Sequence, residues 1–362
     1  MKTQIKQKIN LKNYKGEAFI GIDVHRLTYS VAIVINRTVV KKFQMPADNE
    51  QFIAVVRKLL PQAKLFSVYE AGFSGYTLHR TLEKAHISNI IVNPASIQVA
   101  SKNKVKTDKL DSIKLAQHLS LGLLSGIRIV SSSRENQRLL SRTRRMLVKD
   151  RVRMMARVRA RLLQFNLLPI DYNQVLTLKY VKGLQSQGIF SKELNNSLSI
   201  LLKIWEEIEF ELKNIERVFK TRSKDCPVVK KYMEIPGIGL LSAIVFADEL
   251  GDCSQFANEK SLFSFLGLTP SEHSSGKKIK KGEITRQGNP QLRFMLIECA
   301  WVTIQKDPIL KATYGRIAAR RGGKKAIVAI ARKLIGRARS ILINNSEYEI
   351  NYNRVKTLKK AA

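Results

Sequence analysis

Residues 18–123 alternate strand-like and helix-like segments in an order that few folds accommodate. Five apolar runs have the length and β-branched composition of strands: 18–24, 28–36, 38–43, 65–70 and 87–92. Amphipathic stretches follow the third, fourth and fifth runs and predict helices: 49–60, 76–85 and 108–123. Asn36-Arg37 fits a two-residue turn, so the first three strands form a meander. The order predicts a five-stranded mixed sheet with helices on both faces.

Four acidic residues fall where this order of elements would bring them together, as in ribonuclease H-like nucleases. Asp23 lies near the end of the first strand, Glu70 ends the fourth, and Asp108 and Asp111 share one face of the third helix. If that helix packs across the ends of the two strands, the carboxylates converge and need a divalent cation to offset their repulsion. Hard oxygen ligands favour Mg²⁺ or Mn²⁺, which serve phosphoryl transfer. Each acid taken alone also fits a solvated or helix-capping residue.

The chain is strongly basic, and its charge indicates a polyanionic partner. Its 64 Lys and Arg outnumber 29 acids, giving a formal net charge of +35, and nucleic acid is the expected ligand. A merely basic soluble protein is the alternative, but the charge is concentrated in particular segments. Residues 311–340, for example, hold ten Lys or Arg and no acid, in helices broken at Gly322-Gly323.

Residues 134–161 hold ten Arg and one Lys against two acids, with no Gly or Pro, which predicts one long helix. A second long helix is predicted over 191–222, and the two form an antiparallel coiled-coil-like arm or meet copies in another subunit. The apolar stripe of the second helix consists of Leu201, Ile204, Ile208, Ile215 and Phe219. An unneutralised arginine run repels itself, which favours a nucleic-acid-binding face over a solvated one. The arginines assigned to that face are Arg142, Arg144, Arg145, Arg151, Arg153 and Arg157.

Two segments further on suit phosphate binding. The run from Ile235 to Gly239 reads as helix, glycine turn, helix, in which Gly237 and Gly239 let backbone amides approach DNA; a tight structural turn is the alternative. The stretch 268–293 places Ser275 among glycines and cations, where a hydroxyl could attack phosphate, although the residues alone favour an ordinary turn. The cations of that stretch assigned to nucleic acid are Lys277, Lys278, Lys280, Lys281, Arg286 and Arg293.

These features predict a sequence of domains. They are an arm at 1–15, a ribonuclease H-like domain at 16–130, a helical arm at 131–225, a C-terminal domain at 226–345 and a basic tail at 346–362. Three scattered cysteines give neither a disulfide framework nor a zinc site. No apolar run reaches the roughly eighteen residues of a membrane span. We therefore expect a cytoplasmic protein with no membrane partner.

Together these residues resemble the insertion-sequence transposases of the one-ten (IS110) type. The first half carries Gly-Ile-Asp23-Val, Tyr-Glu70-Ala-Gly, Asn93-Pro94 and Lys-Thr-Asp108-Lys-Leu-Asp111. The second carries Ile-Pro-Gly-Ile-Gly239, Gly267-Leu-Thr-Pro270, Ser-Ser275-Gly276, Arg286-Gln-Gly288-Asn and Leu292-Arg293. The match spans nearly the whole chain and no catalytic position departs from it.

The resemblance implies DNA recombination in a bacterial or archaeal nucleoid. It implies that Asp23, Glu70, Asp108 and Asp111 bind Mg²⁺ and that Ser275 forms a phosphoserine link to DNA. Donor and target DNA, and a structured noncoding RNA encoded by the element that pairs with both, are the implied partners. Exchange of two duplexes leads us to expect a dimer or tetramer, and we expect acids and serine to form one composite site.

Two other functions fit parts of the sequence. A RuvC-like junction endonuclease would use the four acids with a water nucleophile and leave the serine idle. A non-enzymatic nucleic-acid-binding protein would use only the basic surface, with the acids structural. A denaturation-resistant protein–DNA adduct would separate the first alternative from recombination, and magnesium-dependent cutting would exclude the second.

Overall fold

The computed structural model describes residues 10–94, 108–169, 174–272 and 281–350. The side chains of Asp108, Lys109 and Lys281 also lie outside the described part. The chain divides into two compact units, Met1–Val130 and Ser131–Ala362. The first unit contains η1 (Leu11–Asn13), β1 (Glu17–Val24), β2 (Thr28–Ile35), β3 (Thr38–Pro46), α1 (Asn49–Leu59), β4 (Lys64–Glu70), α2 (Thr77–Lys84), β5 (Ser88–Val92) and α3 (Asp108–Ser120).

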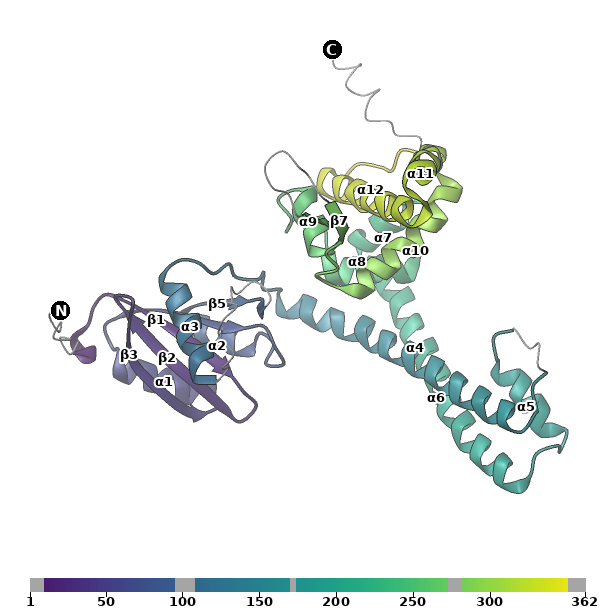
Figure 1. Cartoon of the computed structure of the whole chain (residues 1–362), viewed down its shortest axis with the longest axis horizontal. Helices are drawn as coiled ribbons and strands as arrows, with labels where there is room; N and C mark the ends of the chain where they lie inside the picture. Colours follow the sequence, from purple (N-terminus) through teal and green to yellow (C-terminus); the bar gives the residue numbers. More distant parts are fainter. Residues whose placement is uncertain (1–9, 95–107, 170–173, 273–280, 351–362) are drawn as a thin grey trace, which may run out of the picture. The chain divides into compact units, whose positions relative to one another are not determined.

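The five strands form the mixed sheet that the sequence predicts, in the order β3-β2-β1-β4-β5 (Figure 1). β1 pairs antiparallel with β2 and parallel with β4, and β4 pairs parallel with β5. Asn36 and Arg37 both have positive φ, as a two-residue hairpin turn between right-twisted strands requires. The fold class of this unit is therefore confirmed, although β3 runs three residues further than predicted and α3 ends three residues earlier.

Helices cover both faces of the sheet. On one face, α1 and α2 bury Phe52, Val56, Leu78 and Leu82 against the central strands. On the other face, α3 packs so closely that a Cβ built on Gly21 would lie 2.0 Å from the carbonyl oxygen of Ser112. Any larger residue at position 21 would push α3 off β1. Glycine at this position therefore sets how near α3 lies to the strand that carries Asp23.

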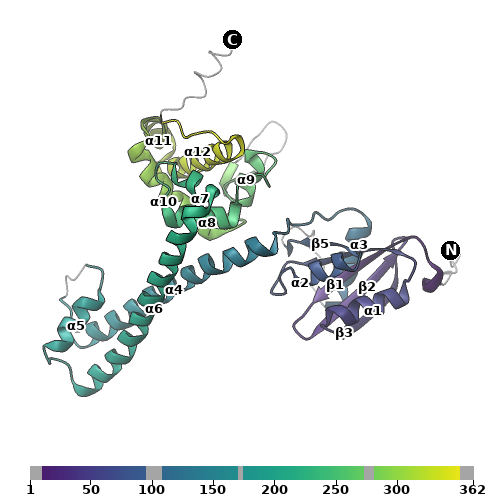
Figure 2. The ribbon, with the colours of Figure 1, turned by 180° about the vertical axis from the view of Figure 1, so that it is seen from behind.

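The second unit begins with two long helices. Its elements are α4 (Ser132–Gln164), α5 (Leu178–Ser186), α6 (Lys192–Asp225), α7 (Pro227–Met233), α8 (Leu240–Leu250), α9 (Glu259–Phe265), β6 (Pro270–Glu272), β7 (Lys281–Ile284), α10 (Pro290–Lys306), α11 (Pro308–Arg321) and α12 (Gly323–Asn344). α4 and α6 lie side by side with α5 at their far end, as both Figure 1 and Figure 2 show. The two helices run antiparallel. Arg144 pairs with Glu216, whereas Arg151, seven residues later on α4, pairs with Glu209, seven residues earlier on α6.

The core of this helix pair includes most of the stripe expected on α6, because Leu201 and Ile208 pack against it, but Ile204 does not. Its buried residues include Leu198, Leu202 and Trp205, whereas Ile204 is 44% exposed. Ile215 and Phe219 are buried as predicted. Burying Trp205 removes more apolar area from water than burying Ile204, so Trp205 takes the inward position beside it.

The helices α7–α12 enclose the largest core of the second unit. α12 lies at its centre, with Ile330, Leu334, Ile335 and Ala338 buried, and α10 packs beside it. Gly322 separates α11 from α12, as the sequence predicts. Across the described parts of both units, no helix is long and apolar enough to cross a membrane.

Candidate active site

Asp23 and Glu70 end two neighbouring parallel strands. Each follows by one residue the parallel pair Ile22–Tyr69, whose side chains are buried on the α1–α2 side of the sheet. Because successive strand residues alternate between faces, Asp23 and Glu70 occupy the opposite face, the one that α3 covers. The alternation of residues along β1 predicts that Asp23 and Gly21 share one face of the sheet. That face is the one that α3 covers.

His25 is a site neighbour that the sequence reasoning missed. Its Nε2 lies 3.1 Å from Oδ2 of Asp23, which accepts the hydrogen bond. The signal was available, because His25 follows Asp23 by two residues and so returns to the same side of the chain. The contact orients the Asp23 carboxylate at the strand end.

α3 adds Asp111 to the same face of the sheet. Asp111 precedes Ser112, whose backbone contacts Gly21 two residues before Asp23 on β1. Carboxylate oxygens from β1, β4 and α3 are the donor chemistry that Mg²⁺ takes, so the residues fit such an ion.

The complete acid set stays a prediction. Within the described side chains, no three His, Cys, Asp or Glu residues gather in a group that could hold a metal ion. The side chain of Asp108, the fourth acid expected in the set, lies outside those described residues. Asp23 and Glu70 both interact with neighbouring groups.

The predicted glycine turn joins α7 to α8, and its two glycines differ in role. Gly237 has φ of +95°, and a Cβ there would lie 2.4 Å from Oγ1 of Thr303 on α10. Gly239 precedes the first turn of α8, is exposed, and has open space around the Cβ position. Close packing against α10 therefore explains Gly237, whereas Gly239 is exposed with open space beside it, and the phosphate-binding role of this turn stays a prediction.

The serine segment connects β6 to β7, a two-stranded antiparallel ladder that the sequence reasoning treated as loop. Ser275, Lys277, Lys278 and Lys280 lie outside the described residues, as does the side chain of Lys281. The base of the ladder is tightly packed, since a Cβ on Gly267 would lie 2.0 Å from the Gln287 carbonyl oxygen.

Two cations predicted to bind nucleic acid stand at this base. Arg286 is exposed, with its Nη2 2.9 Å from Oε2 of Glu283, and Arg293 donates to the Leu266 carbonyl oxygen at 3.1 Å. Burial, followed by the neighbouring Arg286 cation, lowers the pKa of Arg293 from its ordinary value. Arg286 already pairs with the Glu283 carboxylate, and the nucleic-acid role of Arg286 and Arg293 stays a prediction.

The arginines of α4 differ from the unneutralised run expected. Arg142 holds Glu249 through Nε at 2.9 Å and Nη2 at 3.1 Å, and Arg138 lies 3.4 Å from the same carboxylate. Arg144 and Arg151 pair with Glu216 and Glu209 across the arm. The remaining members also have partners: Arg145 with Gln291, Arg153 with Asp150 and Arg157 with the sulfur of Met154. Much of this charge therefore binds α4 to its neighbours, and the nucleic-acid role of these arginines stays a prediction.

Arginines of α4 and α6 stabilise the end of α8. Arg138 donates to the backbone carbonyl oxygens of Asp248 and Glu249, at 3.0 and 2.8 Å, where a helix C-terminus favours positive charge. Arg222 pairs with Asp248 from the other side, while burial raises the pKa of that carboxyl. Two acids at a helix C-terminus oppose the helix dipole, and the arginines offset this.

We predict that Glu249→Ala lowers the free energy of unfolding of the helical unit by about 3 kcal/mol, because it leaves Arg138 buried without its countercharge. Glu249 and Arg138 side chains are only 4% and 11% exposed. Both tryptophans of the chain, Trp205 and Trp301, lie in this unit, so tryptophan fluorescence during denaturation reports on it alone.

The matched control is Asp150→Ala, which removes an exposed pair with Arg153 on the same helix. Its effect should stay within about 0.5 kcal/mol. Equal shifts for the two variants would show that Glu249 does not act as a buried countercharge.

Comparisons with known proteins match both units. A family model of DEDD transposases of the IS110 type, described as "Transposase", matches residues 20–167, and the "Transposase IS116/IS110/IS902 family" model matches residues 229–315. The protein y4qE of Sinorhizobium fredii, named as a transposase, is 28% identical over 79% of this chain and 71% of its own length. The transposase for insertion sequence element IS1533 of Leptospira borgpetersenii is 27% identical over 88% of this chain and 94% of its own. The transposase for element IS1111A of Coxiella burnetii is 27% identical over 74% of each chain.

Proposed function

We propose, from the premise that this chain belongs to the IS110-type transposases of insertion sequences, that it cuts and rejoins DNA through a serine nucleophile. Transposition of DNA follows from the family, and the RuvC-like mixed sheet agrees with its DEDD model. The observation that carries the catalytic proposal is the position of Asp23 and Glu70 at the ends of adjacent parallel strands, with α3 packed directly beside them.

The acids are proposed to hold Mg²⁺ or Mn²⁺. Asp23, Glu70, Asp108 and Asp111 would be the ligands, and the bound ion would stabilise negative charge on a phosphate and favour the deprotonated nucleophile. The contact from His25 would keep the Asp23 carboxylate turned in one direction. We expect the four acids and Ser275 to act on the same scissile phosphate, as one composite site.

Ser275 is proposed as the nucleophile. Its Oγ attacks the scissile phosphorus, the bond to the leaving deoxyribose oxygen breaks, and that oxygen leaves as a hydroxyl carrying the proton that the serine loses. Attack by another strand's hydroxyl reverses these steps and restores both the phosphodiester and the serine. Because the covalent link conserves the phosphodiester bond, strands can be exchanged without ATP.

The test is a covalent adduct. Wild-type protein incubated with Mg²⁺ and end-labelled DNA from the element's terminus should yield a labelled band that survives denaturation, and digestion of that band should map the linkage to the peptide containing Ser275. Cleaved DNA with no adduct would instead indicate a water nucleophile and contradict the proposal.

A structured noncoding RNA is the further partner that we propose, in an assembly of two or four chains. The net charge of +35 supports it, since this is more positive charge than one short duplex requires. Protein purified from cells carrying the complete element should retain one abundant RNA transcribed from the element's flanks, identified by sequencing the extracted nucleic acid. A random sample of cellular RNA would contradict a guide.

A further inference from the structure

The hairpin of α11 and α12 carries a set of cations that have no acidic partner within the described residues. α11 and α12 contain no acid, and the ion pair of this region joins Arg337 to Asp307. Arg337 and Arg339 serve the fold, since Arg337 also contacts Tyr348 and Arg339 donates to the Phe256 and Ala257 carbonyl oxygens. Five other cations line one side of the hairpin and are here called the hairpin cations: Arg316, Arg320, Lys325, Arg332 and Lys333.

The hairpin cations belong to one surface because of helix periodicity. Arg316 lines a groove of about 1260 Å³ between α9, α11, α12 and residues 346–349, and Arg320 is one turn further along the same face of α11. Arg332 and Lys333 line the groove from α12, and Lys325 lies two turns before them on the same face. The positive surface therefore begins in the groove and continues toward the turn at Gly322.

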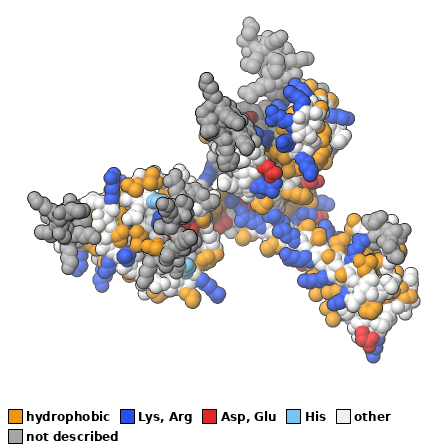
Figure 3. Space-filling model, viewed as in Figure 1, with side chains coloured by type: hydrophobic (Ala, Val, Ile, Leu, Met, Phe, Trp, Pro, Cys, Tyr) orange, Lys and Arg blue, Asp and Glu red, His pale blue; other side chains and the backbone are white. Residues whose placement is uncertain are grey.

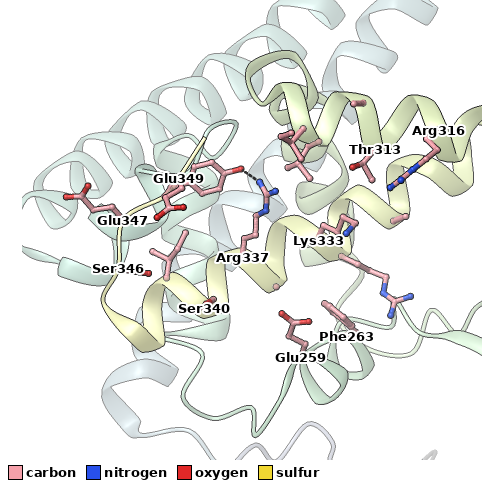
Figure 4. A pocket seen from close by; sticks show the side chains of 18 residues that line it. Glu259, Phe263, Thr313, Arg316, Lys333, Arg337, Ser340, Ser346, Glu347 and Glu349 are labelled. Carbon is pink, nitrogen blue, oxygen red and sulfur yellow. Dashed lines mark hydrogen bonds between the residues drawn. The ribbon is translucent and has the colours of Figure 1, made fainter. Parts of the chain in front are cut away.

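Charge is polarised along the groove. Figure 4 shows Arg316 and Lys333 toward one end and Glu347 and Glu349 toward the other, with Glu259 beside Phe263 between them. In the view of Figure 3, Lys and Arg side chains gather over the helices α11 and α12. Arg332 is held in place by the Phe263 ring, 4.7 Å from the ring centroid. A polyanion would follow the basic end and be repelled at the acidic end, which gives the surface a direction.

We propose that the hairpin cations form a binding surface for the phosphate backbone of duplex DNA. Except for Arg332, these cations are exposed, and they are spread over two helices. That arrangement suits several weak phosphate contacts with counterion release, rather than one small anion in a dry pocket. The surface lies beyond the residues that the family models match, and it shares no residue with the arginines of α4 or the serine segment. The inference rests on the proposed function only in taking DNA as the substrate.

The test measures binding without catalysis. In Mg²⁺-free buffer, fluorescence anisotropy with a labelled duplex should show that the triple variant Arg316→Gln/Lys325→Gln/Lys333→Gln binds at least about tenfold more weakly at low salt. The slope of log affinity against log salt concentration should fall by about 3, since each lost phosphate contact removes about 0.9.

The control is Lys203→Gln/Lys213→Gln/Lys220→Gln, which removes the same charge from exposed lysines of α6. It should leave the slope nearly unchanged, and tryptophan-fluorescence unfolding should show that both proteins remain folded. Equal losses in the two variants would overturn the proposal, because the effect would then be net charge alone. Loss confined to an RNA hairpin probe would equally overturn it by making the surface an RNA site.

This experiment separates the surface from the serine chemistry. Binding in the absence of Mg²⁺ needs no nucleophile, so an idle Ser275 would leave the anisotropy result unchanged. Conversely, if the hairpin cations do not bind DNA, the triple variant still forms the serine adduct with wild-type yield at subsaturating DNA.

Discussion

Replacing Ser275 by alanine is expected to abolish the covalent protein–DNA adduct while leaving DNA affinity within about twofold of wild type. The substitution removes the only atom that would bond to phosphorus, but it removes no charge that contacts the backbone. Adduct formation would be followed by denaturing electrophoresis of labelled DNA, and affinity by anisotropy. The adduct should be lost completely, because an alanine side chain at position 275 has no nucleophilic atom.

The neighbouring Ser274 supplies the matched control for that variant. Ser274→Ala should keep the adduct, because it changes the same segment by the same hydroxyl deletion. An adduct that persists in Ser275→Ala but disappears in Ser274→Ala would move the nucleophile by one residue. If both variants retain the adduct, Ser271 or no serine carries the role.

The second large effect is expected at the acids. Asp23→Asn should reduce magnesium-dependent strand cleavage by about three orders of magnitude, because an ion at a phosphate contributes several kcal/mol of charge stabilisation. The amide nearly preserves the shape of the side chain, so folding and DNA binding should persist. Asp108→Asn should reduce cleavage in the same way, which would show by activity that Asp108 belongs to the acid set.

Glu50→Gln provides a control of equal charge change in the same unit, because Glu50 is exposed in the first turn of α1. It should cleave at the wild-type rate. Mn²⁺ affinity, measured by paramagnetic resonance, gives a readout independent of activity. It should fall in Asp23→Asn but not in Glu50→Gln. Undiminished wild-type cleavage in excess chelator would contradict the metal proposal.

Much of the first unit could be predicted because its signals are local. Each strand is a short β-branched run with its own turn, and the period of two placed Asp23 on a face before any packing was known. The closeness of α3 to β1 at Gly21 could not be predicted, because it depends on two segments about ninety residues apart touching at one point.

The serine segment shows a different limit. β6 and β7 contain only three and four residues, with no apolar alternation, and their pairing continues in backbone hydrogen bonds from Thr285 to Thr269 and from Arg286 to Gly267. Short polar strands carry little signal of their own, and the segment reads as loop. Its candidate nucleophile was identified through resemblance, and the residues alone favoured a turn.

The sequence by itself determined the order of the elements, the two long helices and the excess of positive charge. Only the tertiary structure decided which of those charges are available to a partner. Arg142 and Glu249 are 107 residues apart in the chain, yet their side chains meet at 2.9 Å, while Arg316 and Lys333 have no acid in contact among the described residues. Electrostatic attraction depends on distance in space and is screened within about 10 Å in salt solution. A count of arginines along the chain therefore reports total charge, and the fold determines where that charge remains free.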